Sequence, residues 1–133
     1  MDVASQRVTG GSEPWPFASR GDLGLDRRRV TQCALSRICG VCGESLSRPV
    51  AFLGSRAEAD ANAFHFPPTH VACAEVAVTV WGEERSSALG HASHPAEWVL
   101  VTTSGFEYVR PGEEWVDRRS VFSPNSVIET RAV

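Results

Sequence analysis

Two pairs of residues with metal-binding side chains are the most informative feature of this 133-residue chain. The first pair has the spacing Cys39-x-x-Cys42, and the second has the spacing His70-x-x-Cys73. Thiolate and imidazole groups in two such pairs are a ligand set of tetrahedral zinc. Four protein ligands saturate the ion and leave no open position, which is typical of structural sites. The sequence therefore predicts a closed structural zinc site at Cys39, Cys42, His70 and Cys73.

Glycines accompany the first ligand pair. Gly40 lies inside the pair, and Gly43 follows it directly. They supply the conformational freedom of a tight turn, in which both thiolates face one ion while backbone N–H groups turn toward the sulfurs. The segment therefore indicates a zinc knuckle more strongly than a Cys-x-x-Cys pair alone.

An iron–sulfur cluster is an alternative, because the chain has four cysteines. Their spacing is one residue away from that of a plant-type [2Fe–2S] cluster, for which the ligands would be Cys33, Cys39, Cys42 and Cys73. Such a cluster would make the chain a redox protein. Zinc is preferred because Cys33 falls in a predicted helix and because His70 would have no role in the cluster.

A further histidine, His65, could replace one ligand or support a ligand through a hydrogen bond. It lies between Phe64 and Phe66. Apolar neighbours on both sides favour a buried, hydrogen-bonded imidazole. His65 is therefore kept as an alternative ligand and not as a member of the preferred set.

The pair His91-x-x-His94 could also chelate a metal. Pro95 follows at once and no carboxylate is spaced to complete a ligand set, so ordinary loop histidines are preferred. If the central zinc ion had an open position, these histidines with Glu83 or Glu84 would be the acid–base groups of a metalloenzyme. The chain has no nucleophile elbow, phosphate loop or dinucleotide fingerprint. A binding role is therefore preferred to an enzymatic one.

The second ligand pair is expected in the first turn of a helix. Pro67 and Pro68 end the preceding structure, and Thr69 is a favourable N-cap. Residues three apart in a helical turn lie on one face, so both ligands can reach the same ion. The helix is expected to end at Gly82. Alternation over residues 76–80 leaves a strand as the alternative there.

Another helix is expected within residues 23–38, where apolar residues recur at helical spacing and Asp26 can act as N-cap. Arg27, Arg28 and Arg29 follow this cap. Three arginines at a helix start oppose the helix dipole. They are interpreted as a solvated face, with a phosphate-contacting cluster as the alternative.

The rest of the pattern predicts strands and turns. One strand is expected at residues 48–54, followed over residues 56–64 by a loop or a short helical turn. Apolar runs between turn signals predict a small antiparallel sheet in the C-terminal third, at residues 97–130. Its strands are expected at residues 98–103, 106–110, 115–116, 121–122 and 127–128. The fold class is therefore α+β.

Composition indicates one ordinary domain, since 42% of the residues are hydrophobic and 22% are charged. We expect this domain at residues 15–130, with its first residues docked as an extended arm and residues 1–14 disordered. A net charge of −3 provides no overall basic face. A protein partner is therefore favoured over nucleic acid, which only a local arginine cluster could bind. No apolar run approaches the length of a membrane span and no signal-peptide pattern is present, so we expect no membrane role and a cytoplasmic location.

A knuckle, a β-hairpin and a helix that carries the second ligand pair resemble the treble-clef zinc finger, over residues 38–82. The resemblance implies that Cys39, Cys42, His70 and Cys73 are the four ligands. The chain is also similar to uncharacterised small proteins of actinobacteria and their phages. The shared segments are found here at Cys39–Gly43, Pro67–Ala74 and Val99–Thr102.

The expected function is that of a zinc-stabilised interaction module. It would present Arg27–Arg29, the segment 55–64 or a sheet edge to a macromolecular partner. Treble-clef folds serve both protein and nucleic acid recognition, so the fold alone does not select the partner. A metalloenzyme with an open zinc site and a [2Fe–2S] redox protein are the alternatives.

Overall fold

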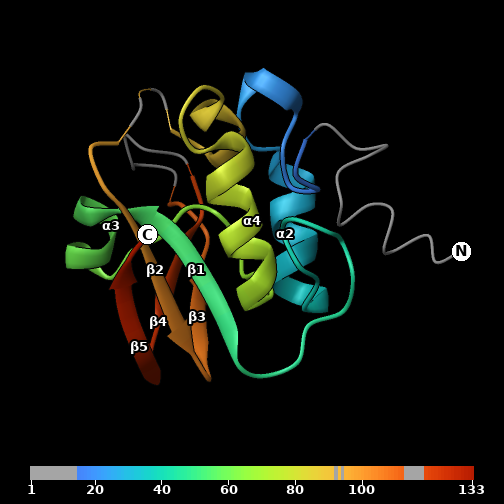
Figure 1. Cartoon of the computed structure of the whole chain (residues 1–133). Helices are drawn as coiled ribbons and strands as arrows, with labels where there is room; N and C mark the ends of the chain where they lie inside the picture. The colour runs from blue at the N-terminus through green and yellow to red at the C-terminus, as the bar shows by residue number, and fades with distance from the viewer. Residues whose placement is uncertain (1–14, 92, 94, 113–118) are drawn as a thin grey trace, which may run out of the picture.

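The computed structural model describes residues 15–91, 93, 95–112 and 119–133. The arm expected at residues 1–14, the short strand expected at residues 115–116 and His94 lie outside the described residues. The elements in chain order are η1 (Gly21–Leu23), α2 (Arg27–Ser36), β1 (Val50–Ser55), α3 (Arg56–Ala61), α4 (Val71–Trp81), η2 (Ser86–Leu89), β2 (Trp98–Thr103), β3 (Phe106–Val109), β4 (Val121–Pro124) and β5 (Val127–Ala132). Helices α2 and α4 lie next to each other, and α4 packs against β1 (Figure 1).

The strands form two antiparallel sheets, one with the order β1-β2-β5 and one made of β3 and β4. β1 pairs along its whole length with β2, from Val50 opposite Thr103 to Ser55 opposite Trp98. The small antiparallel sheet is thus confirmed, but the prediction that it belongs to the C-terminal third alone is wrong. β1 joins it because the backbone groups of this buried strand need a paired neighbour.

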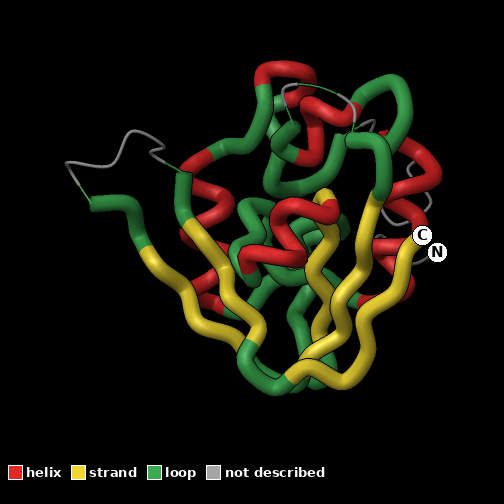
Figure 2. Tube along the Cα trace, turned by 90° about the vertical axis from the view of Figure 1, so that its left-hand side faces the viewer, coloured by secondary structure: helices red, strands yellow, loops and turns green. Residues whose placement is uncertain are grey.

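The two sheets are joined at a pair of turns. Ser104 and Gly105 connect β2 to β3, and Asn125 and Ser126 connect β4 to β5. The backbone N–H of Ser104 donates to the carbonyl of Ser126 at 3.0 Å, and that of Asn125 donates to the carbonyl of Gly105 at 3.1 Å. The two sheets therefore diverge from a shared end, as Figure 2 shows.

Phenylalanines fill the space between the sheets. The ring of Phe52 on β1 lies 5.8 Å from the rings of both Phe64 and Phe122, and 5.3 Å from the ring of Phe106. Phe52, Phe64 and Phe122 are fully buried. Burying each such side chain stabilises the fold by about 1.5–3 kcal/mol. This aromatic cluster explains how the short strands β3 and β4 are held against β1.

Helix α2 begins as predicted. The carboxylate of Asp26 accepts hydrogen bonds from the backbone N–H groups of Arg28 at 2.9 Å and Arg29 at 3.1 Å. The helix ends at Ser36, before Arg37, which has a positive φ of 54°. The predicted N-cap at Asp26 is therefore confirmed.

Helix α4 covers residues 76–80, so the helical prediction is confirmed over the strand alternative. The prediction that Thr69 caps this helix is wrong, because His70 occupies the N-cap position. Thr69 is buried, and its backbone pairs with Ala51 while its hydroxyl donates to the carbonyl of Ala51 at 3.2 Å. Thr69 is thus held at the edge of the sheet one residue before the helix begins.

The segment after β1 forms a short helix, α3, and not a loop. Ser55 and Glu58 make a capping box, in which the backbone N–H of Glu58 donates to the Ser55 hydroxyl at 3.2 Å and that of Ser55 donates to the Glu58 carboxylate at 2.8 Å. Helices α2, α3 and α4 have 10, 6 and 11 residues. In the described ranges, no helix has both the length and the apolar character needed to cross a membrane.

Residues 38–82, all of which the structure describes, contain a knuckle turn bridged between Ile38 and Ser45, one strand and two helices. The hairpin implied by the treble-clef resemblance is not formed as two strands. β1 takes β2 as its partner, and only a single bridge joins Ala51 to Thr69. The segment thus has the knuckle and the ligand-bearing helix, while its strand belongs to a larger sheet.

Candidate metal centre

The four predicted ligands come together in one cluster. The Sγ atoms of Cys39, Cys42 and Cys73 and a ring nitrogen of His70 all lie within 4.8 Å of one another. The three cysteines are buried, and His70 is half-buried. The cluster joins the knuckle to the start of α4, and it could hold a metal ion.

The knuckle turns its backbone toward the first sulfur. The N–H groups of Val41 and Cys42 donate to Cys39 Sγ at 3.3 and 3.5 Å, and the N–H group of His70 donates to the same sulfur at 3.5 Å. Such donors stabilise a thiolate, which is the form that binds metal. The N-terminal residue of the second ligand pair thus also supports the first ligand.

The ring of His70 is oriented for metal binding. Its Nε2 atom lies 2.9 Å from the carbonyl oxygen of Ser45, which can only accept a hydrogen bond, so Nε2 carries a proton. In the neutral ring the lone pair is then on Nδ1, which lies 3.5 Å from Cys42 Sγ and 3.7 Å from Cys73 Sγ. Metal-bound histidines typically have this arrangement of one ring nitrogen on the ion and the other donating to a carbonyl.

The separations match tetrahedral zinc. An ion about 2.3 Å from sulfur and about 2.05 Å from nitrogen separates the two ligand atoms by about 3.6 Å at tetrahedral angles. The separations of 3.5 and 3.7 Å measured from His70 Nδ1 bracket this value. The donor set of three thiolates and one imidazole is also one that zinc uses in structural sites.

Without an ion, three sulfurs this close cannot all be negatively charged. Hydrogen bonds from the thiols of Cys39 and Cys73 lower the pKa of Cys42 to about 3. Hydrogen bonds to the sulfurs of Cys39 and Cys42 raise the pKa of Cys73, and hydrogen bonding to Cys42 together with burial raises the pKa of Cys39. The metal-free cluster is therefore expected to hold one thiolate, and a divalent cation is what would allow all three to ionise.

Gly40 is required where the knuckle meets the segment before α4. A Cβ atom at position 40 would lie 2.7 Å from Pro67 Cγ and 2.8 Å from Phe66 Cε2. The N–H of Gly40 donates to the carbonyl of Pro68 at 2.9 Å. Gly43, by contrast, is needed for its conformation, since its φ is +79°. Gly40 thus brings the two ligand-bearing segments into contact, and Gly43 provides the turn of the knuckle.

Phe17 and Ala18 also pair with the backbone of the knuckle. The N–H of Phe17 donates to the carbonyl of Val41 at 3.0 Å, and that of Ala18 donates to the carbonyl of Gly40 at 2.9 Å. Ala18 is fully buried. The knuckle is therefore held by protein contacts on both sides as well as by its ligand residues.

Cys33 and His65, the two alternative ligands, lie outside the cluster of four. Cys33 is fully buried in α2, and burial together with the charge of the nearby Cys39 and Cys42 sulfurs raises its pKa to about 12. The ring of His65 donates from Nδ1 to the carbonyl of Ser120 at 3.0 Å. The structure thus groups His70, and not Cys33 or His65, with the other three cysteines.

His91 has a structural contact of its own. Its Nε2 atom donates to the carboxylate of Glu58 at 3.1 Å, and its ring meets the ring of Trp98 edge-on at 4.8 Å. Glu83 and Glu84 are exposed and lie outside the ligand cluster. The acid–base set considered for a metalloenzyme is therefore not assembled around these four ligands by the described residues.

The three arginines at the start of α2 are all exposed, but their contacts differ. Arg29 donates to the carbonyl of Phe17 at 3.0 Å, and its guanidinium lies 5.2 Å from the centre of the Phe17 ring. Arg27 instead lines a pocket on the other side of the helix start, and Arg28 is exposed. Within the predicted cluster, Arg29 therefore contacts Phe17, Arg27 lines the pocket and Arg28 faces solvent.

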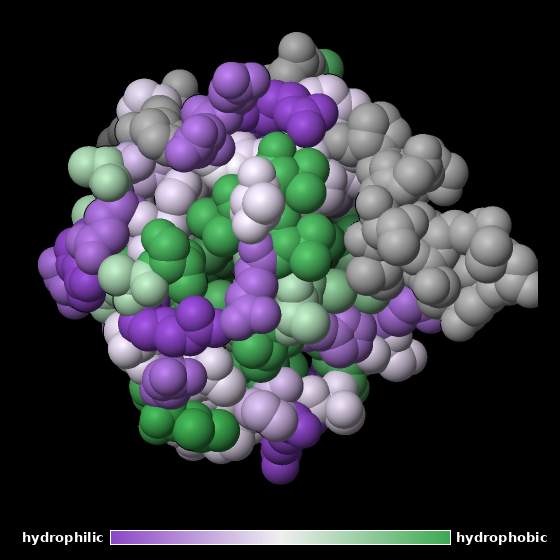
Figure 3. Space-filling view, viewed as in Figure 1, coloured by the Kyte–Doolittle hydropathy of each residue, from purple (hydrophilic) through white to green (hydrophobic). Residues whose placement is uncertain are grey.

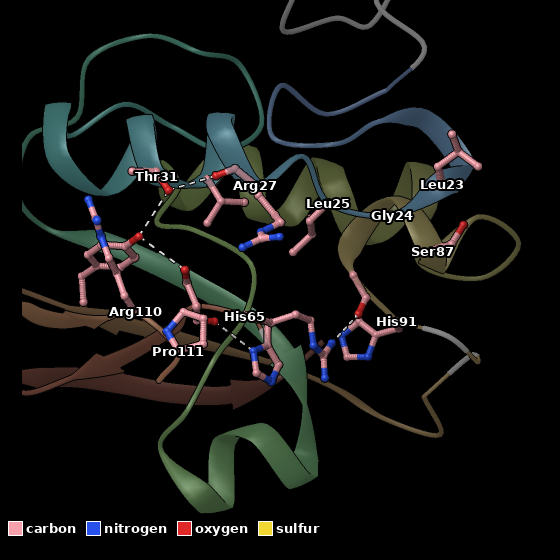
Figure 4. Close-up of a pocket in the computed structure, with 15 residues that line it drawn as sticks. Leu23, Gly24, Leu25, Arg27, Thr31, His65, Ser87, His91, Arg110 and Pro111 are labelled. Carbon is pink, nitrogen blue, oxygen red and sulfur yellow. Dashed lines mark hydrogen bonds between the residues drawn. The ribbon is translucent and has the colours of Figure 1, made fainter. Parts of the chain in front are cut away.

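The pocket that Arg27 lines was not predicted. It has a volume of about 730 Å3 and none of its lining residues belongs to the metal cluster (Figure 4). Arg110, Arg119 and Tyr108 also line it, from the segments around β3 and β4. No local pattern could have revealed these residues together, because their proximity arises only from the packing of α2 against the smaller sheet.

Comparison of the chain with protein-family models, curated proteins and solved structures gives no match. The metal centre is therefore assigned from the geometry of this chain.

Proposed function

We propose that this chain is a zinc-binding protein in which Cys39, Cys42, His70 and Cys73 hold one Zn2+ in a closed structural site. The observation that supports the proposal best is the spacing of 3.5 and 3.7 Å from His70 Nδ1 to the sulfurs of Cys42 and Cys73. With four protein ligands, the ion has no position for a water or a substrate. Its role is to stabilise the contact between the knuckle and α4.

The free energy of zinc binding is large compared with the stability of an ordinary domain. Zinc binding contributes about 10 kcal/mol or more in small finger peptides. The whole stability of an ordinary domain is about 5–15 kcal/mol. Removal of the ion is therefore expected to unfold at least the part of the chain that the knuckle organises.

Metal analysis of the purified full chain tests this proposal. We expect about one zinc per chain, and tetrahedral thiolate bands in the visible spectrum after replacement by Co2+. Cys42→Ser should abolish both signals. Cys33→Ala changes another buried cysteine outside the cluster and should leave both unchanged. A brown, iron-containing protein, or loss of metal in Cys33→Ala, would instead support the [2Fe–2S] alternative.

We also propose that the zinc-stabilised fold binds a protein partner through β5, by addition of a strand. β5 lies at the edge of its sheet, and β2 is the only strand paired with it among the described residues. Val127 and Ile128 on this strand are 51% and 62% exposed. An exposed edge with apolar side chains is a typical surface for strand addition.

The exposed face of α4 offers a less continuous apolar surface than the edge strand β5. Val76 and Val80 on α4 are 37% and 43% exposed. In Figure 3, the hydrophobic side chains on this face are crossed by hydrophilic ones. The negative net charge of the chain also favours a protein over a nucleic acid as partner.

A photo-crosslinking residue introduced at Ile128 tests the edge strand, with Ala57 on α3 as an exposed control position. We expect a covalent adduct of defined mass with another protein from position 128 and none from position 57. An adduct of the chain with itself would show a homodimer, and equal adducts at both positions would contradict a specific edge interaction.

A further inference from the structure

A pocket lies between the start of α2, η2 and the smaller sheet. Its volume of about 730 Å3 falls in the range of small-molecule sites, which is about 300–1,000 Å3. None of the residues that line the pocket belongs to the metal cluster. Both short 3-10 helices, the end of β3 and the segment before β4 contribute to its wall.

The charge of the pocket is strongly one-sided. Three arginines and two histidines line it, and its lining in the described part of the chain contains no carboxylate; the five are Arg27, Arg110, Arg119, His65 and His91. No described carboxylate forms an ion pair with the guanidinium of Arg27 or Arg110. Because the chain as a whole is negative, the three arginine side chains make this pocket a local positive region that favours anions.

Several of the polar groups are already held in place. Arg119 donates from Nη1 to the carbonyl of Gly90 at 3.0 Å, which fixes its guanidinium across the pocket from α2. The hydroxyl of Tyr108 lies 3.3 Å from both the Thr31 hydroxyl and the Ser120 hydroxyl. Figure 4 shows the side chain of Arg27 extending from α2 toward the side of the pocket where His65 and His91 lie. Groups that are fixed before binding lose less entropy when a ligand arrives.

The pKa of Tyr108 also indicates that the pocket favours negative charge. Burial by itself raises the pKa of this phenol, but hydrogen bonds from Ser120, Thr31 and Arg110 outweigh burial and lower its pKa. A pocket that favours the negative form of its own hydroxyl also favours a negatively charged oxygen on a ligand.

Apolar residues form the rest of the wall. Leu25, Val30 and Pro111 line the pocket, and Leu23 at its edge is 73% exposed. A free inorganic anion would leave most of the volume and all of this apolar surface without contact. The geometry points to an organic phosphate of mononucleotide size as the ligand, with the phosphate held by Arg27 and Arg119 and the organic part against the apolar wall.

Phosphate is favoured over a carboxylate by the number of cationic groups. A guanidinium presents parallel N–H donors that match either group. The two guanidinium groups assigned to the phosphate, those of Arg27 and Arg119, exceed the charge of one carboxylate, whereas a phosphate monoester is close to doubly negative at neutral pH.

Isothermal titration of the full, zinc-loaded chain tests the site, with adenosine 5′-monophosphate, ribose 5-phosphate, inorganic phosphate and adenosine as separate probes. We expect at least one of the two organic phosphates to bind more tightly than inorganic phosphate, and adenosine not to bind. Arg27→Gln should weaken the binding about tenfold or more. Arg28→Gln is the matched control, because Arg28 is the neighbouring exposed arginine and does not line the pocket.

Three results would overturn the proposal. The first is that neither organic phosphate binds. The second is that adenosine binds as tightly as adenosine 5′-monophosphate. The third is that the Arg27→Gln and Arg28→Gln variants bind the organic phosphate with equal affinity. Equal affinity for inorganic phosphate would overturn the assignment of an organic ligand. Unfolding curves of both variants show whether a loss of binding reflects a loss of fold, and Arg27→Lys, which keeps the charge, should retain part of the affinity.

Discussion

The Nδ1 atom of His70 lies 3.5 Å from the sulfur of Cys42, although the two residues are 28 positions apart in the chain. Gly40 and Pro68 hold their segments together at this point through a backbone hydrogen bond of 2.9 Å. The contact therefore depends on backbone packing as well as on the ligand side chains.

His70→Ala should remove the zinc and lower the melting temperature, because three thiolates without the imidazole leave the ion one ligand short. His65→Ala is the matched control, since His65 donates to Ser120 and lies outside the cluster. Metal content and thermal unfolding of both variants measure the effect. Retention of a full equivalent of zinc by His70→Ala would show that another residue completes the site.

Gly40→Ala should destabilise the chain by about 1–3 kcal/mol, because the new methyl group has no room. A Cβ atom there would meet the side chains of Pro67 and Phe66 at 2.7 and 2.8 Å. Urea unfolding measures the loss of stability, and zinc affinity should fall with it. Ser47→Ala, at an exposed position of the following loop, is the control and should be close to neutral. Unchanged stability of Gly40→Ala would contradict the close approach of the two segments.

Asp26→Ala should destabilise α2 by about 0.5–2 kcal/mol, because the backbone N–H groups of Arg28 and Arg29 lose their acceptor. Asp26→Asn keeps an acceptor oxygen and should recover most of this stability. Chemical unfolding of the two variants beside the natural chain gives the comparison. Equal losses in both would mean that the charge of Asp26, and not its hydrogen bonds, is what stabilises the helix start.

Glu58→Gln should reduce stability near neutral pH. The Glu58 side chain is 12% exposed, and its carboxylate accepts hydrogen bonds from Ser55, His65 and His91. Burial raises its pKa, but the bond from His91, the bond from Ser55 and the nearby histidine charges outweigh burial, so the pKa lies below the ordinary value of 4.5. Loss of hydrogen bonds to a charged group costs about 1.5–3 kcal/mol.

The pH dependence of this effect has a definite sign. A carboxylate with a lowered folded pKa stabilises the fold fully above its unfolded pKa, and the contribution is lost as the pH falls through the lower folded value. The difference in unfolding free energy between the natural chain and Glu58→Gln should therefore shrink on acidification below 4.5. Acid also releases the metal from both proteins, and this effect cancels when their unfolding free energies are subtracted. Glu97→Gln, at an exposed carboxylate, is the control, and a difference that grows with acid would contradict the assigned direction.

Local features of this protein could be predicted from its sequence. The ligand residue types and their spacing within each pair, the N-cap at Asp26 and the helix that carries Cys73 all depend on contacts between residues a few positions apart. Such contacts are encoded by neighbouring side chains, so a short window of sequence contains them. The N-cap predicted at Thr69 was wrong because this residue pairs with Ala51 of β1, which is distant in the sequence.

Tertiary packing decided the rest. The pairing of β1 with β2, the separation of Arg27 from Arg29 and the pocket that joins Arg27 to Tyr108 all bring distant segments together. An apolar segment can pack equally well against several other segments of the chain, and only the packing of the whole core selects among them. The sequence by itself therefore determined which residues can bind a metal, whereas the tertiary structure determined where the anion pocket lies and which arginines face it.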